Sequence, residues 1–156
     1  MSIAPALQKF LSDQNVAYEL IPHNPTMSAI RSAEACHVSA GCVAKGVLLR
    51  DRDGYWLAVV PASRHVLLSD LKTELGESVD LATEEEIAQM FHDCDRGAIP
   101  PVGPCYGLDV IIDDSIDQLP DLYFEGGDHA TLVHVSRAEF ARLNRPARHG
   151  SFAAHA

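Results

Sequence analysis

The chain has 156 residues, of which 47% are hydrophobic and 22% are charged, and its formal net charge is −10. This length and composition predict one globular domain with a single hydrophobic core rather than a disordered chain or a membrane span. The net negative charge argues against a protein that holds DNA or long RNA by electrostatic attraction, although it is compatible with contact to the end of an RNA.

The first residues and the cysteines indicate the compartment. Residues 1–6 lack the basic region and apolar core of a secretory signal. The four cysteines contain no Cys-x-x-Cys pair, so we expect free thiols rather than disulfides. Together these features predict a soluble cytoplasmic protein.

The first half of the chain predicts a helix, a strand, a second helix and a hairpin of two longer strands. Leu7 and Leu11 recur at helical spacing in the first helix. Thr26 or Ser28 can cap the second helix, and Asp53-Gly54 can supply the turn of the hairpin. The expected ranges, in chain order, are residues 4–14, 16–21, 28–36, 43–49 and 55–60.

The second half predicts three helices and three strands. Ser69 can cap a short helix, and Thr83 with Glu86 and Ser136 with Glu139 form two capping boxes. Two of the strands flank Gly126-Gly127 and are expected to pair. The expected ranges are helices at 69–75, 83–91 and 136–143, and strands at 108–112, 122–125 and 131–135.

These elements predict a mixed α/β domain with mostly antiparallel strands joined by hairpins and with helices interspersed. We expect this domain to span residues 1–145. Residues 146–156 are expected to form a tail without clear periodicity. Around the start of that tail, basic residues outnumber Glu139; they are Arg137, Arg142, Arg145 and Arg148.

Lys45 stands inside an apolar strand pattern. Strand alternation places it on one face with Val43, Val47 and Leu49. The amine is therefore either at a rim, with its stem packed and its charge in water, or at the floor of a pocket. A buried, unpaired ammonium costs several kcal/mol, so the second arrangement needs an anionic or carbonyl partner, which a ligand can supply.

Two glycine-bearing segments are open to two interpretations. Residues 97–103 contain two prolines bracketed by glycines, and Gly126-Gly127 lies between two strands. Each is either an ordinary connection or a place where backbone groups face a ligand. His129, just after the second segment, is either a ligand-binding residue or a solvated histidine in a turn.

Several kinds of chemistry have no motif here. His37 with Cys42 and His92 with Cys94 do not have the spacing of a zinc site, and no His-Glu-x-x-His is present. No Gly-x-Ser-x-Gly elbow, Walker sequence or dinucleotide glycine motif occurs, and Cys105 lacks a local activating signature. We therefore predict neither a metal nor a cofactor.

Taken in order, three segments make the chain resemble the YbaK/prolyl-tRNA synthetase-associated editing-domain family. They are Ala44-Lys45 in its strand, the loop from Gly97 to Pro101-Val102-Gly103, and Tyr123–Gly127 followed by a strand and a helix begun by a serine. The resemblance covers about residues 16–145. It implies a compact α/β domain with a largely antiparallel, barrel-like sheet.

The resemblance also implies hydrolysis of the ester that joins a wrong amino acid to tRNA, often tRNA for proline. Lys45 matches the essential lysine of the family, and Gly103 and Gly126-Gly127 match its pocket glycines. The other residues predicted to bind substrate are Thr26, Gly46, Pro101, Val102 and His129. Because synthetase motifs are absent, the implied protein is a free-standing editor of small amino acids (Ala, Ser, Thr or Cys), with an aminoacyl-tRNA synthetase as a further candidate partner.

An aminoacyl ester is already activated, so its hydrolysis needs positioning and electrostatic help more than a strong nucleophile. The mechanistic hypothesis is that Lys45 binds the carbonyl or terminal phosphate, and that backbone groups near Gly103 and Gly127 orient a water. A non-catalytic module that binds a small ligand or a protein in the same pocket is the alternative. Gly46, where family members often carry a small polar residue, and the acidic composition favour that alternative slightly.

Overall fold

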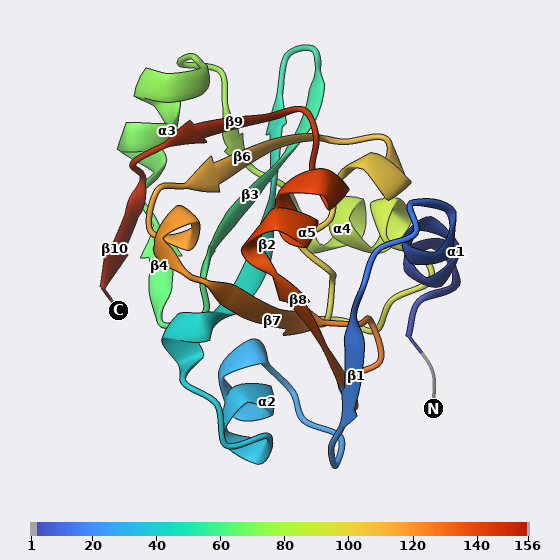
Figure 1. Cartoon of the computed structure of the whole chain (residues 1–156). Coiled ribbons are helices and arrows are strands. Elements are labelled where there is room, and N and C mark those ends of the chain that lie inside the picture. Colours follow the sequence, from blue (N-terminus) through green and yellow to red (C-terminus); the bar gives the residue numbers. More distant parts are fainter. Residues whose placement is uncertain (1–2, 156) are drawn as a thin grey trace.

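Strand β2 (Val43–Asp51) is the centre of the fold in the computed structural model, which describes residues 3–155 (Figure 1). It pairs antiparallel with β3 (Gly54–Pro61) and with the short β5 (Asp80–Leu81), and parallel with β7 (Asp121–Glu125). Met1, Ser2 and Ala156 lie outside the described residues. The predictions made for residues 1–6 and for the tail 146–156 are therefore not tested at these three positions. The predicted hairpin is confirmed, with Asp51 opposite Gly54, so its turn residues are Arg52 and Asp53.

The main sheet runs β1-β8-β7-β2-β3-β6-β9, with β5 beside β2. Its other strands are β1 (Glu19–Pro22), β8 (Thr131–Ser136), β6 (Asp109–Asp113) and β9 (Ala147–Gly150), of which β1 and β9 are at the edges. A second, two-stranded sheet pairs β4 (Arg64–Val66) with β10 (Ala153–His155). Five strand pairings are antiparallel and three are parallel, which confirms a mostly antiparallel mixed α/β fold. The path ends at β1 and β9 without closing, so the barrel-like sheet is an open one.

The helices are short and lie around the sheet (Figure 1). Ser28 accepts a hydrogen bond from the Arg31 amide at the start of α2, and Thr83 with Glu86 forms the predicted capping box of α4. In the described part of the chain, none of the helices is long and apolar enough to cross a bilayer. They are α1 (Pro5–Asp13), α2 (Ala29–Ala35), α3 (Leu68–Leu75), α4 (Glu84–Met90) and α5 (Arg137–Leu143), with single turns η1 (Ala40–Cys42), η2 (Pro104–Tyr106) and η3 (Ile116–Gln118).

The two faces of β2 bury different cores. Ala44 and Leu48 face the larger core, which also contains Leu7 of α1 and Phe124 of β7. Leu49 faces a smaller core formed with residues of α3 and with Phe152 near the C-terminus. This alternation is the one expected from the sequence, and it makes β2 the shared wall of both cores.

Three local predictions were wrong. The first strand begins at Glu19 rather than at residue 16 and includes Pro22, which is tolerated because β1 is an edge strand. Leu67 rather than Ser69 is the N-cap of α3, and it makes no side-chain cap. The Glu139 carboxylate does not return to Ser136 but accepts a hydrogen bond from the Ala17 amide at 2.8 Å, so it holds the chain before β1 against α5.

The C-terminal segment forms two strands that the sequence did not indicate. β9 pairs parallel with β6, and β10 pairs with β4. Between them Phe152 is fully buried, and Asp113 accepts hydrogen bonds from the amides of Phe152 (2.8 Å) and Ala153 (3.0 Å). Residues 147–155 therefore contribute to both sheets and to the smaller core.

Candidate active site

A pocket of about 290 Å³ opens beside β2, between the start of α2 and helix α4. Its walls are mostly apolar, with two carboxylates and one ammonium among them. Such a concave, largely apolar site with a few polar groups is the usual form of a small-molecule site. The lining residues are Met27, Ser28, Ala29, Ile30, Lys45, Gly46, Ala62, Glu84, Ile87, Gly97, Ile99 and Glu125.

Lys45 is the one cationic side chain among these lining residues. It is half-buried, and burial lowers the pKa of its ammonium. Among residues 3–155, no carboxylate lies within 4.0 Å of Lys45 Nζ, as the observed ion pairs involve other residues. The structure thus places Lys45 in the wall of a pocket with its charge unpaired.

Glu125, at the end of β7, contributes a carboxylate to the same pocket, and sequence reasoning did not single it out as a site residue. It is only 2% exposed. Burial raises the pKa of this carboxyl. The nearby Ser32 hydroxyl, His129 and His23 act in the opposite direction and lower it. Neither carboxylate oxygen has a hydrogen-bond partner among the described residues.

Thr26 does not cap α2, and it does not line this pocket. Its hydroxyl donates to the Ser28 carbonyl (3.2 Å) and lies 2.6 Å from Ser32 Oγ. Either hydroxyl can be the donor in the Thr26–Ser32 contact. The Ser32 hydroxyl thus contacts Thr26 and is also a neighbour that opposes the raised pKa of Glu125.

His129 is buried rather than solvated, so the solvated-turn interpretation is wrong. It is 6% exposed, has a φ of 55°, and its ring contacts the Arg96 carbonyl through Nε2. Because the carbonyl can only accept, Nε2 carries a proton, and Nδ1 is left buried without a partner. A Cβ at Gly97 would lie 3.3 Å from the His129 ring, so His129 stands directly behind the pocket wall.

Gly46 brings the proline loop to the pocket. A Cβ at this position would lie 3.0 Å from Leu57 Cδ1 and 3.4 Å from Pro101 Cα. The absence of a side chain therefore lets Pro101 approach β2 closely. Of the predicted loop residues Pro101, Val102 and Gly103, Pro101 lies beside Gly46, although none of the three lines the pocket.

The remaining predicted glycines shape the surrounding loops and do not line this pocket. The Gly103 amide donates to Asn144 Oδ1 at 3.0 Å, and Val102 is buried in the larger core. Gly126 pairs its amide with the Thr131 carbonyl and its carbonyl with the Ala4 amide.

Gly127 has a φ of 110°, and its carbonyl accepts from the Asp95 amide at 2.7 Å. A Cβ there would lie 2.9 Å from Ala4 Cβ. These contacts hold the N-terminal segment and the loop after α4 against the end of β7. The backbone that directly follows Glu125 is therefore fixed by hydrogen bonds.

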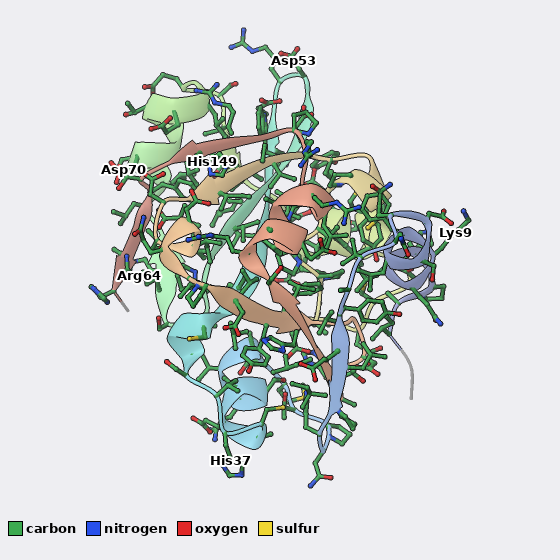
Figure 2. The ribbon with its side chains drawn as sticks, in the orientation of Figure 1. Lys9, His37, Asp53, Arg64, Asp70 and His149 are labelled. Atoms are coloured by element: carbon green, nitrogen blue, oxygen red, sulfur yellow. The ribbon has the colours of Figure 1, made fainter. Side chains whose placement is uncertain are left out.

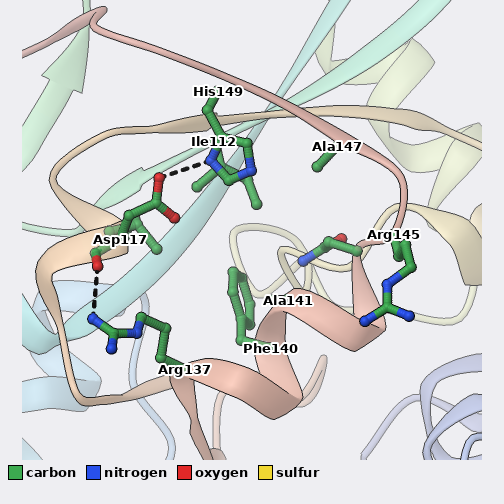
Figure 3. Close-up of a pocket in the computed structure, with 10 residues that line it drawn as sticks. Ile112, Asp117, Arg137, Phe140, Ala141, Arg145, Ala147 and His149 are labelled. Atoms are coloured by element: carbon green, nitrogen blue, oxygen red, sulfur yellow. Dashed lines mark hydrogen bonds and ion pairs between the residues drawn. The ribbon is translucent and has the colours of Figure 1, made fainter.

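A second pocket, of about 210 Å³, lies between η3, α5 and β9 (Figure 3). Asp117 makes two polar contacts in this pocket. Its Oδ2 lies 2.7 Å from His149 Nδ1, and its backbone carbonyl accepts a hydrogen bond from Arg137 Nη1 at 2.9 Å. The polar groups of this pocket are therefore largely engaged with each other, in contrast to those around Lys45. Near this face, Arg148 also lies within 3.8 Å of Glu74.

The histidines and cysteines of the described residues form no metal site, and Cys94 and Cys105 are not reactive thiols. Within residues 3–155, no group of three or more His, Cys, Asp and Glu side chains is placed to hold a metal ion, and His37 points away from the body of the protein (Figure 2). Burial raises the pKa of Cys94 and of Cys105 to about 12. Both thiols are therefore protonated at neutral pH and unsuited to act as nucleophiles.

The model of the aminoacyl-tRNA editing domain family matches residues 23–143. The chain belongs to this family, which defines it as a domain with a role in aminoacyl-tRNA editing. The matched range contains Lys45, Glu125 and His129. A search among curated proteins found no match.

Solved structures show the same fold at low sequence identity. A candidate trans-editing enzyme for prolyl-tRNA synthetase superimposes with a TM-score of 0.83 at 21% identity, covering 96% of this chain and 95% of that one. A hypothetical protein matches with a TM-score of 0.84 at 20% identity, covering 96% and 99%. A scaffold used in computational grafting of linear epitopes matches with a TM-score of 0.84 at 18% identity, covering 98% and 97%.

Proposed function

We propose that this protein is a free-standing, trans-editing deacylase that hydrolyses the ester bond of mischarged aminoacyl-tRNA. The observation that carries the proposal is the unpaired, half-buried Lys45 ammonium in a pocket inside the family match. Neither a metal nor a nucleophilic side chain is needed, because the aminoacyl ester is already activated. The proposed site of action is the cytoplasm, where tRNA is charged.

Lys45 is the group proposed to assist the reaction. Its ammonium is placed to bind the ester carbonyl oxygen or the terminal phosphate, and its partial burial strengthens either interaction. A charge held in this way stabilises the negative charge that develops on the carbonyl oxygen as water attacks. The ribose hydroxyl of the substrate itself is proposed to assist proton transfer.

The water is proposed to be held by groups that face the pocket. The Gly103 amide donates to Asn144, the Gly127 carbonyl accepts from the Asp95 amide, and neither glycine lines the pocket, so we do not propose these two for the water-orienting role that the sequence suggested. Gly97 and Ile99 line the pocket and offer backbone groups in their place. Pro101 and Gly46 set the distance between this loop and β2.

The size and lining of the pocket favour small amino acids. A volume of about 290 Å³ with walls of Ile30, Ile87 and Ile99 accommodates a small side chain and part of the ribose. Alanine, serine, threonine and cysteine are the proposed substrates. The likeness to a structure described as acting for prolyl-tRNA synthetase supports tRNA for proline as the carrier and that synthetase as a partner.

The test is hydrolysis of a panel of mischarged tRNAs by the purified protein, with the variants Lys45→Ala and Lys9→Ala. Lys9 is an exposed lysine of α1 that points into solvent (Figure 2), so it is a matched control for loss of one ammonium. We expect Lys45→Ala to lower the rate by about 100-fold or more and Lys9→Ala to leave it unchanged. Full activity of Lys45→Ala on every ester that the intact protein cleaves would refute the proposal, and binding without hydrolysis would favour the non-catalytic module.

A further inference from the structure

We propose that Glu125 is the subsite for the α-ammonium group of the substrate amino acid, an inference that rests on the proposed editing function. It assigns a role to a residue of the Tyr123–Gly127 segment that the catalytic proposal does not use. The consequence is a chemical filter. The pocket accepts esters of free α-amino acids and discriminates against acyl esters that lack the ammonium.

The first step is the state of the Glu125 carboxylate. Both oxygens are buried, and neither has a hydrogen-bond partner among the described residues. A buried carboxylate left without partners is costly, and native proteins rarely keep one. Yet Glu125 lines a pocket that is open to a ligand, so a partner can come from outside the protein.

The second step concerns the side chains around the Glu125 carboxylate. The Ser32 hydroxyl lies 2.6 Å from Thr26 Oγ1, and Thr26 Oγ1 lies 3.2 Å from the Ser28 carbonyl. The protonated nitrogen of the His129 ring is committed to the Arg96 carbonyl. His23 Nε2 and His129 Nδ1 are also buried without partners. Ser32, His129 and His23 oppose the raised pKa of Glu125, but among the described residues none forms an observed hydrogen bond to its oxygens.

The third step is the separation of the two charges in the pocket. Lys45 and Glu125 line the same space, but they do not form one of the observed ion pairs. A ligand complementary to both must carry a cation at one end and an oxygen acceptor at the other. The aminoacyl ester of a tRNA has this order, because its α-ammonium is one carbon from the ester carbonyl and the terminal phosphate lies beyond the ribose.

The geometry behind Glu125 fits a positioning role. Gly126 and Gly127 are fixed by hydrogen bonds to Ala4, Thr131 and Asp95, and β7 pairs with β2 next to Lys45, with Ala44 opposite Phe124. The carboxylate is therefore held at a set place relative to the Lys45 ammonium. Binding the α-ammonium at Glu125 would orient the ester carbonyl toward Lys45.

The experiment compares two esters of the same shape on the same tRNA. In lactyl-tRNA a hydroxyl replaces the ammonium of alanyl-tRNA, so charge changes while size hardly does. Each kcat/KM is divided by the uncatalysed hydrolysis rate of that ester. If serine is the better substrate, glyceryl-tRNA replaces lactyl-tRNA in the same design.

We expect the wild-type protein to favour the alanyl ester by about 10- to 100-fold, the range for a hydrogen-bonded charge. Glu125→Gln should reduce this preference to less than about 3-fold, mainly by slowing the alanyl ester. Glu85→Gln is the matched control. It removes one carboxylate from the exposed face of α4, outside the pocket lining, and should keep the wild-type preference.

The possible failures are distinct. If the wild-type protein cleaves both esters equally, or if folded Glu125→Gln keeps the wild-type preference, the ammonium subsite is wrong while the editing function stands. If the protein accelerates hydrolysis of no mischarged tRNA, the editing function itself is wrong. The comparison of esters on the wild-type protein does not depend on how well any variant folds.

Discussion

Two regions of this molecule bury polar side chains, and they differ in whether those side chains have hydrogen-bond partners. Asn144 and Asp113, on the side of the sheet where β6 and the C-terminal strands meet, are 0% and 3% exposed. Asn144 donates to the Pro101 carbonyl and accepts from the Gly103 amide, both at 3.0 Å. Asp113 accepts from the amides of Ser115, Phe152 and Ala153.

At the pocket, Glu125 and His129 are buried to a similar extent but keep unpartnered atoms. Each unsatisfied buried group costs about 1–3 kcal/mol. The first region therefore gains fold stability from its polar groups, whereas the second gives up stability to keep polar groups available. Such a cost is expected where a ligand completes the hydrogen bonds.

The largest expected effect is on the satisfied side, in the variant Asn144→Ala. It leaves the Gly103 amide and the Pro101 carbonyl buried without partners, so we expect the free energy of unfolding to fall by about 3 kcal/mol. Urea denaturation followed by circular dichroism measures it. A loss below about 1 kcal/mol would mean that the two regions do not differ in the way described.

The opposite sign is expected at the pocket, in the variant Glu125→Gln. Burial raises the pKa of Glu125 above its ordinary value of 4.5, so the folded state binds the proton more tightly than the unfolded state. Wild-type stability therefore falls as the pH rises from 4.5 through the raised value. Glu125→Gln should remove this slope and gain on the order of 1 kcal/mol at pH 8.

The measurement for Glu125→Gln is the free energy of unfolding at a series of pH values, beside Glu85→Gln. The control changes net charge equally at an exposed position. A Glu125→Gln protein that is less stable than the wild type at pH 8 would show that the carboxylate has partners that stabilise the fold.

The smallest effect is expected for His134 on β8, a partly buried side chain whose hydrogen-bond partners are exposed. Burial lowers the pKa of this imidazole, but hydrogen bonds to Glu19 (2.6 Å) and Asp121 (3.1 Å) outweigh burial and raise it above 6.5. The stabilisation is present below pH 6.5 and is lost as the pH rises through the raised value. Because both carboxylates are largely exposed, it should be below about 1 kcal/mol.

His134→Gln should abolish that part of the pH dependence. The ring also stacks on Tyr123, with centroids 4.3 Å apart, so the variant is compared with the wild type by slope and not by absolute stability. Hydrogen bonding through both ring nitrogens requires the imidazolium. Identical slopes for the two proteins between pH 6 and 8 would show that His134 does not hold β1 to the sheet by charge.

Local sequence signals predicted the elements that depend on neighbouring residues. The Thr83–Glu86 capping box and the alternation along β2 involve residues within a few positions of each other, and both are confirmed. Lys45 could be recognised because a charge interrupts an apolar strand pattern. The same pattern could not decide between a rim and a pocket, because that depends on α2 and α4 packing nearby.

The features that sequence reasoning missed depend on distant residues. Asn144 engages residues 41 and 43 positions away, so Gly103 could not be recognised as a residue whose amide is already paired. β9 is an edge strand with mostly exposed side chains, so it has no apolar alternation to detect. Glu125 was visible as a residue before a glycine turn, but its lack of partners exists only in three dimensions.

The central position of β2 has a consequence for how the two sides of the pocket move. On one edge of β2, Lys45 and Gly46 lie opposite Val60 and Val59 of β3, whereas on the other edge the pairing with β7 ends at Ala44 and that with β5 begins at Leu49. The β2 amides that are bonded to β3 should exchange hydrogen for deuterium at a rate set by opening of the whole domain. Residues 27–30 lie across the pocket on a short segment that includes the exposed Met27 and Ile30. Their amides should exchange through local fluctuations, so ligand binding should slow exchange there and leave β2 nearly unchanged.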